Sequence, residues 1–117
     1  MMELSQGVWS GLGVGARALR FDAQHQVLGV LAGARAVEFS FENRGDRPVR
    51  LIRSWASCGC IKVSLPPAAI APGGRGKVVL HVDTADQLPG PMWMLAKVYT
   101  DLDPKRPFLL AAEGELQ

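Results

Sequence analysis

The stretch Val37-Glu38-Phe39-Ser40-Phe41-Glu42-Asn43-Arg44-Gly45 decides the fold class of this chain. Val37, Phe39 and Phe41 alternate with polar residues, which is the period of two expected for a strand with one buried face. Asn43 and Gly45 belong to the residue types that favour turns, because both tolerate backbone conformations that other residues avoid. The stretch therefore predicts a half-buried β-strand that ends in a turn.

The same alternation recurs in short segments along the rest of the chain. It is present over 49–53, 61–65, 77–83 and 108–112, with a further strand expected before Gly29. Residues 93–99 are apolar on both faces, which predicts a central strand covered on each side. Pro and Gly clusters interrupt the chain about every ten residues, and no segment keeps helical spacing for about three turns. We predict an all-β protein, an immunoglobulin-like antiparallel β-sandwich of about seven strands, although composition alone also fits a small barrel.

Length and charge limit the domain organisation and the classes of partner. The 117 residues suffice for one domain, which we expect over 18–117, preceded by a loosely ordered lead-in over 1–17. A net charge of +2 from 13 basic and 11 acidic residues is too small for a nucleic-acid-binding surface. No stretch reaches the roughly 18 apolar residues of a membrane span, and the beginning of the chain predicts no export signal.

The only two cysteines, Cys58 and Cys60, are separated by Gly59. In an extended strand their Cα atoms would be about 6 to 7 Å apart, at the outer limit for a disulfide, so we expect Gly59 to bend the chain through a positive φ. Three interpretations remain open: packing beneath Trp55, an easily reduced disulfide or redox role, and metal capture, where two thiolates suit Cu(I). Other possible ligands are distant in sequence and are interpreted as packing or solvent-exposed side chains: Met92, Met94, His25 and His81.

Three motifs occur in an order that resembles a bacterial family, domain of unknown function 1573. They are FSFENRG (Phe39 to Gly45), WASCGC (Trp55 to Cys60) and IAPG (Ile70 to Gly73). The resemblance covers about residues 20–116. It implies an immunoglobulin-type sandwich related to bacterial interaction modules, often exported or lipid-anchored, with no established enzymatic activity. The positions that it marks as structural are Phe39, Phe41, Asn43, Gly45, Ser57, Gly59, Pro72 and Gly73.

The function expected from these observations is a non-enzymatic interaction or scaffolding module. Exposed strand edges or loops would hold a protein partner, since an uncovered strand offers free N–H and C=O groups. We expect no catalytic residue and no cofactor apart from Cu(I) in the alternative function, a Cu(I)-binding or thiol/disulfide-responsive domain that uses Cys58 and Cys60. The resemblance implies a periplasmic or other extracytoplasmic location.

Overall fold

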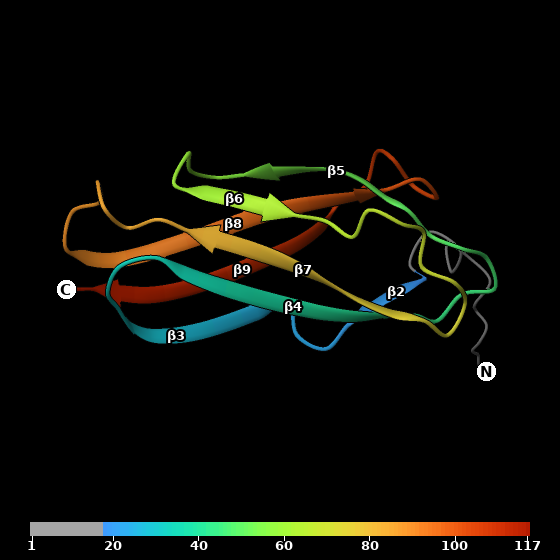
Figure 1. Cartoon of the computed structure of the whole chain (residues 1–117), viewed down its shortest axis with the longest axis horizontal. Coiled ribbons are helices and arrows are strands. Elements are labelled where there is room, and N and C mark those ends of the chain that lie inside the picture. Colours follow the sequence, from blue (N-terminus) through green and yellow to red (C-terminus); the bar gives the residue numbers. More distant parts are fainter. Residues whose placement is uncertain (1–17) are drawn as a thin grey trace, which may run out of the picture.

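Two four-stranded sheets pack face to face in the computed structural model, which describes residues 18–117 (Figure 1). The first sheet has the order β2 (Leu19–Phe21), β4 (Arg35–Asn43), β7 (Arg75–Val82) and β6 (Ile61–Ser64). The second has the order β3 (His25–Leu31), β9 (Phe108–Leu116), β8 (Gly90–Thr100) and β5 (Leu51–Ala56). The all-β sandwich is confirmed, with eight described strands where about seven were predicted. The predicted lead-in over 1–17 lies outside the described residues.

The strand pairs are antiparallel with one exception among the described strands, the parallel pair of β3 and β9. β2 pairs with β4 in the first sheet. The chain then crosses to the second sheet, where β3 runs in the same direction as β2. It therefore meets β9, which also runs that way, in parallel (Figure 1). The purely antiparallel sandwich predicted from sequence is corrected at this edge, because alternation alone carries no information about strand direction.

The core lies between the sheets and is made mostly by the inward-facing residues of four long strands. On β4, Phe39 and Phe41 are 1% and 0% exposed, as the alternation predicted. Full burial of a side chain of this size contributes about 2 to 3 kcal/mol to stability. The other strands contribute Val78, Leu80 and Val82 of β7, Met94, Ala96 and Val98 of β8, and Leu110 and Ala112 of β9.

Two details of the second sheet differ from the sequence-based expectation. The register of β5 against β8 shifts between Leu51 and Arg53, so Leu51 is buried while Arg53 is exposed, although alternation placed them on one face. Strand β8 is central in its sheet, but Trp93 is 68% exposed. The outer face of β8 is therefore open in the described structure, and its apolar residues do not indicate a second covering layer.

Candidate functional site

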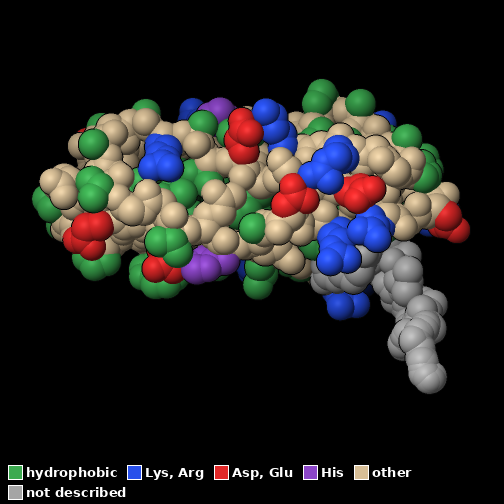
Figure 2. All heavy atoms as spheres, turned by 90° about the horizontal axis from the view of Figure 1, so that it is seen from below, with side chains coloured by type: hydrophobic (Ala, Val, Ile, Leu, Met, Phe, Trp, Pro, Cys, Tyr) green, Lys and Arg blue, Asp and Glu red, His purple; other side chains and the backbone are tan. Residues whose placement is uncertain are grey.

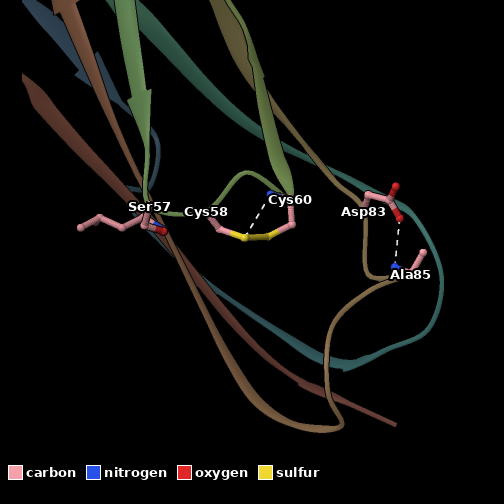
Figure 3. The surroundings of a disulfide bond; sticks show 6 residues. Ser57, Cys58, Cys60, Asp83 and Ala85 are labelled. Carbon is pink, nitrogen blue, oxygen red and sulfur yellow. Dashed lines mark hydrogen bonds between the residues drawn. A yellow bond between two sulfur atoms is a disulfide. The ribbon is translucent and has the colours of Figure 1, made fainter.

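The two cysteines lie in a tight turn that joins β5 of one sheet to β6 of the other. Cys58 and Cys60 form a disulfide, with their Cα atoms 5.1 Å apart (Figure 3). The Ile61 N–H donates to the Cys58 carbonyl oxygen (3.1 Å), which closes the turn. Gly59 is not among the glycines with positive φ, so the predicted bend is present but the predicted backbone conformation is wrong. A hydrogen-bonded turn shortens the separation of the cysteines without a left-handed residue.

Each cysteine has a specific backbone contact in this turn. The Cys60 N–H donates to Cys58 Sγ (3.0 Å), and the Cys60 carbonyl accepts from the Asp83 N–H (2.8 Å). Both cysteine side chains are half-buried and pack against the edge of the core. Trp55 is 47% exposed, and the Lys97 ammonium lies 4.9 Å from its ring centre. The pair is thus neither fully enclosed in the core nor fully exposed at a loop tip.

A hollow of about 640 Å³ lies beside the disulfide, which we call the disulfide hollow. Its charged or ionisable residues are Arg35, Lys62, His81, Asp83 and Asp86. The remainder of its lining is Ala34, Ala36, Gly59, Cys60, Val82 and Gln87. The hollow therefore brings β4, β6 and β7 together with the loop after β7, and sequence spacing gave no sign of it.

The metal-binding interpretation finds little support in this geometry. Both sulfur atoms are joined to each other, so neither is a thiolate. Among residues 18–117 there is no group of three or more His, Cys, Asp or Glu side chains placed to hold an ion. Met94 is buried in the core, His81 contacts the Ser64 hydroxyl (3.0 Å), and His25 contacts Glu113 (2.7 Å). These side chains are thus in the packing or surface contacts predicted from sequence.

The buried Asn43 links the other two motifs at the opposite end of β4. It is 0% exposed, and its amide donates to the carbonyls of Arg47 (2.8 Å) and Ile70 (2.9 Å). Its side-chain oxygen accepts from the Gly45 N–H (3.0 Å). Its backbone oxygen accepts from the N–H of Gly73, which has a φ of +80°. Asn43 therefore joins the strand–turn motif to the turn that contains Pro72.

Steric contact explains Gly45 better than backbone conformation does. A Cβ placed on Gly45 would lie 2.7 Å from the Cβ of Ala18, whereas a Cβ on Gly59 would meet nothing within 4 Å. Ser57 has a different role, since its N–H donates to the Leu95 carbonyl (2.8 Å) and its hydroxyl accepts from the Leu95 N–H (3.1 Å). Among the motif residues, Asn43, Gly45 and Ser57 thus have specific structural contacts.

The outer face of β5 and β8 carries an arrangement of aromatic and basic side chains that sequence analysis missed. The Arg53 guanidinium lies 4.0 Å from the Tyr99 ring centre, and Lys97 covers Trp55 as described above. Arg53 pairs with Tyr99 and Trp55 pairs with Lys97 in the register of the two strands. Cation–π contacts of this kind hold the basic groups over the rings. The strand register was needed to find them.

Charge elsewhere on the surface is mixed. Figure 2, seen from below relative to Figure 1, shows basic and acidic side chains next to one another on that face. Arg75, at the beginning of β7 and remote from the disulfide hollow, has its pKa raised by a hydrogen bond from its guanidinium to Asp22 (2.7 Å). No helix in residues 18–117 is long and apolar enough to cross a membrane.

The two packed sheets define the class of this protein, an immunoglobulin-like β-sandwich, and solved structures share this fold. A protein of unknown function from Porphyromonas gingivalis W83 matches with a TM-score of 0.71 and 16% identity over 85% of this chain and 46% of its own. The PapD-like domain 7 of human CEP192 matches with a TM-score of 0.64 and 12% identity, covering 100% and 97%. The CupB2 chaperone of Pseudomonas aeruginosa matches with a TM-score of 0.61 and 14% identity, covering 81% and 54%.

The family follows from the sequence itself. The model of the family "Protein of unknown function (DUF1573)" matches residues 20–116, so the chain belongs to this family, and the resemblance seen in the three motifs is confirmed. No curated protein matches the chain. The chain spans about half the length of the Porphyromonas protein and of the CupB2 chaperone. The likeness to these structures therefore establishes the fold only. The function is inferred below from the geometry of the site.

Proposed function

We propose that this chain is a non-enzymatic protein-interaction module that binds an extended segment of a partner protein along β5. The observation that carries the proposal is the exposure of this strand. β5 pairs with β8 on one side, and no described strand is hydrogen-bonded to its other side. Four consecutive residues, Ile52 to Trp55, are exposed. A strand with one free edge can accept another strand by backbone hydrogen bonding.

The register shows which backbone groups of β5 are available. The Ser57 backbone N–H donates to the Leu95 carbonyl, and the pairs that follow are Ala56 with Ala96 and Trp55 with Lys97. In an antiparallel ladder alternate residues bond to the neighbouring strand. Trp55 and Arg53 therefore bond toward β8, while Ser54 and Ala56 direct their N–H and C=O groups toward the free edge.

The other edge strands are poorer candidates. β2 and β6 have only 3 and 4 residues. β3 has 7 residues, but its register is interrupted near Gly29, which has a φ of 73°. A side chain of β3 also bonds to the other sheet: the Gln26 amide donates to the Glu38 carbonyl of β4 (2.7 Å). β5 also has a register shift, between Leu51 and Arg53, but from Arg53 to Ala56 its register is continuous, and the hydrogen bond from Ser57 to Leu95 extends this run by one residue.

The side chains beside this edge indicate the chemistry of the partner segment. Ile52 and Trp55 are 44% and 47% exposed, and Arg53 and Lys97 lie on the same outer face. A segment that alternates apolar and acidic residues would complement both features. The likeness to CupB2, which is named a chaperone, also supports a protein partner.

We further propose that the protein acts outside the cytoplasm. The Cys58–Cys60 disulfide supports this location, because disulfides persist mainly in oxidising compartments. The alternative function, Cu(I) capture, requires both sulfurs as thiolates and therefore prior reduction of the bond. An anaerobic Cu(I) titration of the reduced protein against a competing chelator tests it, and tight one-to-one binding would favour metal handling over the interaction module.

The interaction proposal is tested with a photo-crosslinking amino acid at position 54 and, as control, at the exposed position 77 of β7. A partner captured at 54 but not at 77 is then tested for binding to Ser54→Pro and Ser54→Ala. Proline removes the N–H at the free edge while the β8 ladder remains, so Ser54→Pro should weaken binding at least about tenfold and Ser54→Ala should not. Equal crosslinking at both positions, or full binding by a folded Ser54→Pro protein, would contradict the proposal.

A further inference from the structure

The disulfide hollow gives the Cys58–Cys60 bond an asymmetric environment. Gly59 and Cys60 line the hollow, whereas Cys58 is not among its lining residues. In Figure 3 Cys60 lies on the side of the disulfide that faces Asp83, whose N–H donates to the Cys60 carbonyl, and Cys58 lies on the side of Ser57. A molecule bound in the hollow thus approaches Cys60 first.

The hydrogen bond within the turn is made to the other sulfur, that of Cys58. The Cys60 N–H already donates to Cys58 Sγ at 3.0 Å. A donor in this position stabilises the thiolate that forms on Cys58 when the bond is broken. A thiol with a lower pKa leaves faster in thiol–disulfide exchange. Cys58 is accordingly the better leaving group, and Cys60 is the cysteine that lines the hollow.

We propose that the Cys58–Cys60 disulfide exchanges with a small peptide thiol bound in the disulfide hollow, with attack at Cys60 Sγ and departure of Cys58 Sγ. The volume of about 640 Å³ lies within the range of roughly 300 to 1,000 Å³ typical of small-ligand sites. Arg35 and Lys62 provide positive charge and Asp83 and Asp86 negative charge, which suits a zwitterionic ligand with both a carboxylate and an amine.

The exchange proceeds in two balanced steps. The ligand thiolate attacks Cys60 Sγ, a new S–S bond forms between ligand and Cys60, and the electron pair of the old bond leaves on Cys58 Sγ. A second ligand thiolate then attacks the ligand sulfur of this mixed disulfide and releases Cys60 as a thiolate. Two ligand thiols are oxidised to one ligand disulfide, the protein disulfide is reduced to a dithiol, and the two protons pass to Cys58 and Cys60.

The position of attack is measured directly with reduced glutathione, a zwitterionic tripeptide thiol, as the probe. The oxidised full chain is incubated with it, quenched by rapid alkylation, and digested with trypsin to release residues 54–62. Fragmentation of this peptide should place glutathione on Cys60 and the alkyl group on Cys58 with about a fivefold or greater preference. The oxidised synthetic peptide of the same sequence, which has no hollow, is the control and should show no such preference. Glutathione mainly on Cys58, or equal preferences in protein and peptide, would overturn the proposal.

The leaving-group assignment has its own test in the reduced state. The pH dependence of alkylation gives the thiol pKa of Cys58 in Cys60→Ser and of Cys60 in Cys58→Ser. Serine keeps the N–H at position 60, so the Cys58 pKa should be the lower of the two. Differential alkylation of the reduced wild-type chain gives the same comparison if either variant fails to fold. A Cys58 pKa equal to or above that of Cys60 would overturn the assignment.

Recognition by the hollow is tested with Lys62→Ala and, as matched control, Lys77→Ala, whose lysine pairs with Glu38 outside the hollow. Lys62→Ala should slow exchange with glutathione about threefold more than exchange with 2-mercaptoethanol, because both attack as thiolates but only glutathione also carries carboxylates. Lys77→Ala should change neither rate. Equal effects of the two substitutions, or equal effects on the two thiols, would refute binding in the hollow.

Discussion

Replacing Asn43 with alanine removes three side-chain hydrogen bonds from a fully buried position. The amide donates to the carbonyls of Arg47 and Ile70, and the side-chain oxygen accepts from the Gly45 N–H. Each bond contributes roughly 0.5 to 1.5 kcal/mol, and a buried group left without a partner costs more. The Ile70 carbonyl keeps the N–H of Val49 as a second donor, so part of the loss is avoided.

We expect Asn43→Ala to lower the free energy of unfolding by about 3 kcal/mol. In a domain of this size such a loss lowers the melting temperature by roughly 10 to 20 °C. Urea unfolding followed by tryptophan fluorescence, with thermal unfolding followed by circular dichroism, measures both quantities. Tryptophan fluorescence is suitable because Trp55 and Trp93 lie on the sheet that packs over the core.

The matched control is Gln24→Ala, which removes an amide of the same chemistry from an exposed position. Gln24 donates one hydrogen bond, to the Leu109 carbonyl (3.0 Å). We expect this substitution to cost less than about 1 kcal/mol. If Asn43→Ala costs no more than Gln24→Ala, Asn43 does not join the motifs energetically, and the explanation given for the strand–turn motif is refuted.

Two glycines and the disulfide give further predictions. Gly114→Ala should destabilise by about 1 to 3 kcal/mol in urea unfolding, because the new Cβ would lie 2.8 Å from the Leu31 side chain and 2.9 Å from the Gly29 carbonyl oxygen; an unchanged midpoint would show that both neighbours move without cost. Gly59→Ala should change stability by less than about 0.5 kcal/mol, since its Cβ would meet nothing within 4 Å, and a larger loss would mean that the turn needs glycine. Cys58→Ser with Cys60→Ser should lose less than about 2 kcal/mol and still unfold cooperatively, because so short a loop removes little entropy from the unfolded chain; loss of cooperativity would make the disulfide essential for folding.

Much of the candidate site was predictable from local pattern. Alternation in Val37 to Phe41 identified the buried face of β4, and the two cysteines drew attention to the only turn in 18–117 that holds a disulfide. Pattern did not predict the disulfide hollow. Its walls come from β4, β6 and β7, which are distant in sequence, and only strand pairing such as Lys62 with His81 and His81 with Ala36 brings them together.

The sequence by itself determined the strand-forming segments, the turns between them and the membership of the family, because alternation and turn residues act over a few neighbouring positions. Tertiary structure alone decided which strands became edges, that β3 runs parallel to β9, and that Arg53 lies over Tyr99. It also decided that Asn43 contacts Ile70, 27 residues further along the chain. These features depend on contacts between distant segments, whose geometry is set by how the two sheets bury their common core.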